Sequence, residues 1–195
     1  MSAMAIAFER YRISVEEYHR MVEAGVFQDD RRIELINGQL IETVAPIHPP
    51  HTYSTRQLVA AFFARFASRA AVYIQMPVTL PPNSEPEPDV ALARQDAKNY
   101  VDRHPGPGDL YVVIEVADST LLMDRRLKVP LYARAGVKEL WLVNIPDDRI
   151  EVYRDPVGRR YQQIATAQRG DTIEMLAFPG ETFAVDDILP PPQSL

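Results

Sequence analysis

The segment Leu110–Ala117, LYVVIEVA, constrains the fold more than any other part of this sequence. Its apolar residues occupy both faces of an extended chain, which is typical of a strand inside a sheet covered on both sides. We therefore predict a central strand here, with Phe62, Phe66, Val113 and Trp141 contributing to the core. The one acid in the segment is Glu115. An ionised carboxylate buried in a strand is costly unless it is paired or binds a metal.

The order of the other elements predicts a mixed α/β fold. Helix patterns cover 14–25, with a capping box between Ser14 and Glu17, then 51–70 and 121–135. Strand patterns cover 72–80, 89–93, 110–117 and 138–145, with hairpins at 31–44, around Asn37-Gly38, and at 149–167, and two short pieces within 171–189. We expect one domain, 1–195, with a central mixed sheet flanked by helices, extra β-hairpins and a frayed tail at 190–195.

Composition excludes several classes of protein. The chain has 195 residues, no cysteine and a formal net charge of -6. It has neither a signal-peptide pattern at its start nor an apolar run of roughly 18 residues, so we expect a cytoplasmic protein without a membrane span. A protein that coats nucleic acid is usually basic. Any contact with DNA must therefore be transient, or must use a local basic patch.

A second acid lies where the preceding strand begins. Asp89 follows Pro88 directly and opens the pattern 89–93. If this strand is an antiparallel neighbour of the central strand, the start of one meets the end of the other, and Asp89 lies near Glu115. Two carboxylates with water suit Mg²⁺. The alternatives are a turn aspartate and a glutamate that faces solvent or an arginine.

Basic residues follow on the next predicted helix. Lys128 can place an ammonium near a metal and offset charge on a phosphate. The basic residues on and just after this helix form a group of candidate phosphate ligands: Arg125, Arg126, Lys128, Arg134 and Lys138. A run of charges on a helix is otherwise a solvated face.

These motifs carry a family resemblance. EPDVAL and VVIEVADST resemble the PD-(D/E)xK nuclease core. Together with IELINGQLIE, HTYSTRQL, DRRLKVPLYARAGVKELWLV and IEVYRD they resemble the Uma-type family of putative restriction endonucleases, over nearly the whole chain from about residue 14. The resemblance implies a restriction-endonuclease-like core at about 31–154, a C-terminal β extension at about 155–189, and metal-dependent hydrolysis of phosphodiester bonds.

The resemblance also implies roles for single residues. Asp89 and Glu115 become metal ligands, with the carbonyl of Val116 as a third. The wider superfamily has its lysine two residues after the glutamate, where this chain has Ala117, and the Uma-type pattern has it on the following helix, where this chain has Lys128.

Three further positions bear on the site. His51 and Glu34 match family positions and are accessory candidates. Their alternatives are a cap or surface histidine, and a glutamate paired with an arginine. Pro130 is expected to kink the helix near Lys128.

The resulting expectation is an endonuclease that uses Mg²⁺ or Mn²⁺, acts on DNA and forms a homodimer, since cutting both strands usually needs two active sites. One alternative is an inactive nuclease-fold protein that serves as a binding or assembly module, favoured by the acidic net charge, Ala117 and Pro130. Another is a hydrolase of a small phosphoester, which the lack of a glycine-rich phosphate loop disfavours.

Overall fold

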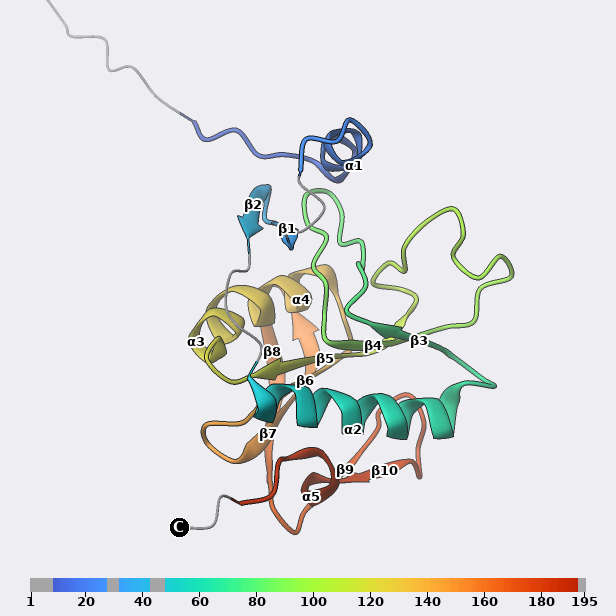
Figure 1. Cartoon of the computed structure of the whole chain (residues 1–195), viewed down its shortest axis with the longest axis vertical. Helices are drawn as coiled ribbons and strands as arrows, with labels where there is room; N and C mark the ends of the chain where they lie inside the picture. Colours follow the sequence, from blue (N-terminus) through green and yellow to red (C-terminus); the bar gives the residue numbers. More distant parts are fainter. Residues whose placement is uncertain (1–8, 28–31, 43–47, 193–195) are drawn as a thin grey trace, which may run out of the picture.

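A six-stranded mixed sheet organises the molecule (Figure 1). The computed structural model describes residues 9–27, 32–42 and 48–192. The strand order is β3-β4-β5-β6-β7-β8. The strands are β3 (Ala71–Ile74), β4 (Val90–Ala93), β5 (Leu110–Ala117), β6 (Glu139–Asn144), β7 (Arg149–Val157) and β8 (Arg160–Gln168). The expected mixed α/β class, with a central sheet flanked by helices, is confirmed.

The prediction of a central strand at β5 is also confirmed. β5 pairs antiparallel with β4 and parallel with β6. Side chains alternate between the faces of a strand. Accordingly Ile114 and Val116 join one hydrophobic cluster, whereas Val113 and Ala117 join another on the opposite face. Glu115 has the same parity as Val113, so it lies on the second face.

Helix α2 (Pro49–Phe66) covers the first face (Figure 1). Its residues Leu58, Phe62 and Phe66 recur every four positions and are fully buried against the sheet, where Phe62 packs edge-on against Trp141. Burying such side chains stabilises the fold by roughly 1.5–3 kcal/mol each. Phe63, on the outward side of the helix, is 46% exposed.

The second face is covered by a helix in three parts: α3 (Leu121–Met123), the π-helical turn η1 (Asp124–Lys128) and α4 (Val129–Ala135). The expected kink at Pro130 takes the form of this widened turn. Proline has no N–H and would clash with the carbonyl four residues back in a regular α-helix. Here the N–H of Val129 bonds to the carbonyl of Asp124, five residues back, so the wider turn accommodates the ring.

One predicted strand and one predicted helix have different boundaries in the structure. The strand expected at 72–80 ends at Ile74, because Gln75 adopts a φ of 49° and turns the chain. The helix expected at 51–70 begins at Pro49, whose ring is preset for the first helical turn, and ends at Phe66.

The remaining elements lie outside the large sheet. Helix α1 (Val15–Glu23) has the predicted capping box, and β1 (Ile33–Ile36) and β2 (Gln39–Glu42) form the predicted hairpin. The two short strand pieces predicted within 171–189 are β9 (Thr172–Glu174) and β10 (Thr182–Ala184), which pair with each other. The short helix α5 (Val185–Ile188) follows, and the sequence pattern did not indicate it. Within the described residues, no helix is both long and apolar enough to cross a membrane. Residues 193–195 of the tail expected to fray lie outside the described residues.

Candidate active site

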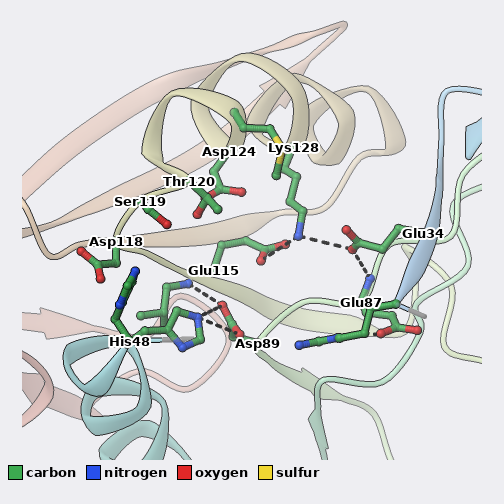
Figure 2. Close-up of a pocket in the computed structure, with 14 residues that line it drawn as sticks. Glu34, His48, Glu87, Asp89, Glu115, Asp118, Ser119, Thr120, Asp124 and Lys128 are labelled. Carbon is green, nitrogen blue, oxygen red and sulfur yellow. Dashed lines mark hydrogen bonds and ion pairs between the residues drawn. The ribbon is translucent and has the colours of Figure 1, made fainter. Parts of the chain in front are cut away.

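A polar pocket lies where the carboxyl end of β5 meets the start of α2, hairpin strand β1 and the π-helical turn (Figure 2). Five residues named from the sequence line it: Glu34, His51, Asp89, Glu115 and Lys128. Val116 lines it as well. These residues come from separate segments of the chain, so the pocket is a product of the tertiary fold.

The register of β4 and β5 explains why the two acids meet. Val90 is opposite Ile114 in the antiparallel pair. Continuing that register by one residue sets Asp89 opposite Glu115, and opposite residues of two strands project to the same face. Asp89 accepts a hydrogen bond from the backbone N–H of Val116 at 2.8 Å and another from Gln75 at 3.2 Å.

Asp89 is held in its ionised form. His51 Nε2 lies 3.3 Å from both carboxylate oxygens of Asp89. Burial alone would raise the pKa of Asp89, but the hydrogen bond and charge of His51 and the N–H of Val116 bring that pKa below its usual value. In turn, the hydrogen bond to Asp89 raises the pKa of His51. The other ring nitrogen, Nδ1, is buried without a hydrogen-bond partner among the described residues.

The pKa of Glu115 is shifted in the opposite direction from that of Asp89. It is 3% exposed, and burial raises its pKa to about 8, although the charge of Lys128 works in the other direction. Tyr132 donates a hydrogen bond of 2.7 Å to Oε1, and Lys128 donates one of 3.2 Å to Oε2. Two neighbouring carboxyls with pKa values moved apart, inside one pocket, are typical of functional sites.

Lys128 is not a solvated surface lysine. Its ammonium lies 3.2 Å from Glu115 and 3.3 Å from Glu34, and the residue is 8% exposed (Figure 2). Burial alone would lower its pKa, but the surrounding carboxylates raise it above the usual value. The lysine is therefore charged, and it joins the strand glutamate to the hairpin.

Glu34, an accessory candidate from the sequence, pairs with Lys128. The alternative was a pair with an arginine. Besides Lys128, its carboxylate accepts the backbone N–H of Glu87 at 2.7 Å. Glu34, which is 5% exposed, therefore ties the hairpin to the site, and Arg32 beside it lies 3.8 Å from Glu87.

Of the five candidate phosphate ligands, Lys128 alone lines the pocket. Neither Arg125 nor Arg126 lines the pocket. Arg125 instead bonds to Glu151 on β7 and lies 3.6 Å from Asp147, whereas Arg126 is exposed. The cations at the pocket are Lys128 and Arg32, together with two histidines.

Several lining residues were not selected from the sequence. They are Arg32, His48, Glu87, Asp118, Ser119, Thr120, Met123 and Asp124. Asp124 shares a helix face with Lys128 and Tyr132, and this spacing was the available signal; burial raises its pKa. Asp118, Ser119 and Thr120 directly follow β5, at the strand end where sites of α/β sheets gather.

The oxygen donors suit a hard divalent cation. Among the described residues, no group of three or more His, Cys, Asp or Glu side chains is arranged to hold a metal ion. Mg²⁺ does not need one, because it is commonly bound through one or two carboxylates and keeps several waters. Asp89 and Glu115, buried in a pocket rich in carboxylates, fit that requirement.

Comparison with known proteins now identifies the family. The profile described as "Uma2: Putative restriction endonuclease" matches residues 15–186. The chain belongs to the Uma2 family. The resemblance inferred from the motifs is thereby confirmed. The matched residues include the β1–β2 hairpin, the six strands of the large sheet, and β9 and β10.

A solved structure supports the fold. The chain is similar to the crystal structure of a putative nuclease belonging to DUF820 from Anabaena variabilis, with a TM-score of 0.68 and 14% identity over 90% of this chain and 97% of that chain. At this identity the likeness concerns the fold alone. No curated protein matches the sequence.

Proposed function

We propose that this Uma2 protein is an endonuclease that hydrolyses DNA phosphodiester bonds with the help of Mg²⁺ or Mn²⁺. The observation that carries the proposal is the meeting of Asp89, Glu115 and Lys128 in one pocket. Asp89 and Glu115 are 26 positions apart in the sequence, and Glu115 and Lys128 are 13 positions apart. Membership of a family described as putative restriction endonucleases supports phosphodiester hydrolysis as the reaction class and DNA as the substrate.

The two carboxylates would hold the metal, with the backbone carbonyl of Val116 as a candidate third ligand. Bound there, the cation supplies Lewis acidity to a phosphoryl oxygen and lowers the pKa of water. Asp89 is prepared for this role because it is ionised before any cation arrives. His51 keeps its carboxylate in place.

Lys128 would supply a fixed positive charge beside the scissile phosphate. The ammonium is already positioned by Glu115 and Glu34, so little reorganisation is needed when negative charge develops in the transition state. Arg32 and His48, at the same pocket, are candidate contacts for the neighbouring phosphates.

The test is cleavage of supercoiled plasmid by purified protein with Mn²⁺ or Mg²⁺. We expect nicked and linear products with the parent protein, and a loss on the order of a hundredfold or more with Asp89→Asn, which removes a ligand charge but keeps the side-chain shape. Asp102→Asn is the matched control, because that carboxylate is 52% exposed and pairs with Lys98.

Two outcomes would contradict the proposal. Cleavage that Asp89→Asn leaves unchanged would come from a contaminating nuclease or a different site. If the folded parent protein does not cut DNA with either cation, the alternative of an inactive binding or assembly module is favoured.

A further inference from the structure

Strand β8 is an open edge of the sheet. It is the last strand in the order, and it is nine residues long, whereas the opposite edge strand, β3, has four. In the described part of the chain, the backbone of residues 160–167 has β7 as its only ladder partner. An unpaired edge presents a row of N–H and C=O groups that can accept another strand.

The middle of β8 is exposed on both faces. Residues 162–166 are five consecutive exposed positions, and Ile164 at their centre is 63% exposed. Alternating burial would be expected if a neighbouring layer covered one face of this stretch. The exposure points to a surface that is incomplete in a single copy.

The composition of β8 favours association. Proteins usually protect an edge strand with charges, proline or a bulge. Between Tyr161 and Gln168 there is neither a charged residue nor a proline, although the chain as a whole carries a net charge of -6. Arg160 is the one charged residue of β8, so the strand carries none of the acidic charge that makes two molecules repel each other elsewhere on their surfaces.

We propose that β8 pairs with β8 of a second copy of this chain, antiparallel about a two-fold axis at Ile164. This register sets Ile164 against its own copy, Gln162 against Thr166 and Tyr161 against Ala167. No like charges face each other in it, and the two exposed isoleucines bury one another. The two sheets then form one continuous sheet.

The proposed pairing between the two copies ends at Arg169. Arg169, just beyond the strand, is bound to Asp148 at 2.6 Å and 2.7 Å and to Asp186 at 3.2 Å. In this register Arg169 faces Arg159 of the second copy, and the two aspartates compensate the charge of Arg169 there. A ladder of this length alone buries less than a standard interface of about 800 Å² per partner, so we expect dimerisation that depends on concentration.

The absence of cysteine gives a direct test by disulfide trapping. Opposite residues of antiparallel strands have Cα atoms about 4.5–5.5 Å apart, within the range of a disulfide. Ile164→Cys should form a covalent dimer under mild oxidation. Gln162→Cys and Thr166→Cys should form a heterodimer when mixed but not when alone, since each lies roughly 13 Å from its own copy.

Sedimentation of the full chain provides the second measurement. The parent protein should dimerise with increasing concentration, and Ile164→Lys should remain monomeric. Ile164→Thr should dimerise over nearly the same concentration range as the parent. A parent that is monomeric at every concentration, or equal trapping by all three cysteine variants, would overturn the proposal. Neither measurement depends on cleavage, so failure here is distinguishable from failure of the nuclease proposal.

Discussion

At the scale of single residues, the site contains two acids whose pKa values are shifted in opposite directions. Asp89 has a pKa below its usual value, because His51 and the N–H of Val116 stabilise its charge. Glu115 has a pKa raised to about 8, because it is buried. A cation that binds both carboxylates must therefore displace a proton from Glu115 at neutral pH.

This difference predicts proton-linked metal binding. With a pKa of about 8, Glu115 is mostly protonated in the free protein below about pH 7, so each fall of one pH unit from about pH 7 to pH 5 should weaken Mn²⁺ binding by on the order of tenfold. Calorimetric titration in two buffers of different ionisation enthalpy should detect release of about one proton at pH 7. Affinity that does not change over this range would show that Glu115 is already ionised or is not a ligand.

Tyr132 is a residue that should position Glu115 without touching substrate. Its hydroxyl donates to Glu115 at 2.7 Å, and the side chain is fully buried. Outer partners of metal ligands typically contribute 10–100-fold to affinity or activity, so we expect Tyr132→Phe to weaken Mn²⁺ binding by roughly tenfold.

The matched control for Tyr132 is Tyr161→Phe. It removes another buried hydroxyl, which donates to the backbone carbonyl of Val137 at 2.8 Å, and neither residue lines the pocket. Each variant should lose about 1 kcal/mol of stability, but only Tyr132→Phe should change metal binding. Equal metal affinity in the two variants would assign Tyr132 a structural role alone.

At the scale of elements, Glu151 ties strand β7 to the π-helical turn. It accepts hydrogen bonds from Arg125 at 3.2 Å, Tyr153 at 2.6 Å and Asn144 at 3.0 Å. Burial alone would raise its pKa, but these donors lower it to about 2. Arg125, considered a phosphate ligand from the sequence, is thus a strut that holds the element carrying Lys128.

This strut has a predictable pH dependence. The pKa of Glu151 is lower in the folded than in the unfolded chain. Its contribution to the free energy of unfolding is therefore complete above about pH 4.3 and is lost as pH falls towards about 2. Glu151→Gln should therefore lower stability by about 1–3 kcal/mol at pH 7 and flatten the decline in acid. Urea unfolding at pH 7 and pH 3 checks this, and an unchanged acid profile would contradict it.

The same scale shows what the sequence could predict. The two-sided apolar run at 110–117, the spacing of Leu58, Phe62 and Phe66 by four, and Asn37-Gly38 are local signals. The strand β5, the helix α2 and the hairpin were therefore predictable. The pairing of Lys128 with Glu34 was not, because it joins residues 94 positions apart through tertiary packing. Likewise, Pro130 indicated a distortion but not its π-helical form, which depends on the packing of the helix against the sheet.

At the scale of the whole molecule, the large sheet brings the acids at β4 and β5 to one pocket. Helix α2, the β1–β2 hairpin and the helix on the second face complete it. The two strand acids meet through the β4–β5 register, whereas Lys128 depends on the path of the following helix. The central claim is that this arrangement is a metal-dependent nuclease site in which carboxylates bind the cation and the lysine acts on the phosphate.

The most direct test measures cleavage and metal binding together in Lys128→Met, which keeps much of the side-chain volume and removes the charge. Lys98→Met is the control, since that side chain is 69% exposed. The account predicts a folded variant whose single-turnover plasmid cleavage falls by on the order of a hundredfold or more, while Mn²⁺ affinity is kept or increased because a competing cation has gone. Cleavage equal to that of the parent and of Lys98→Met would contradict the account.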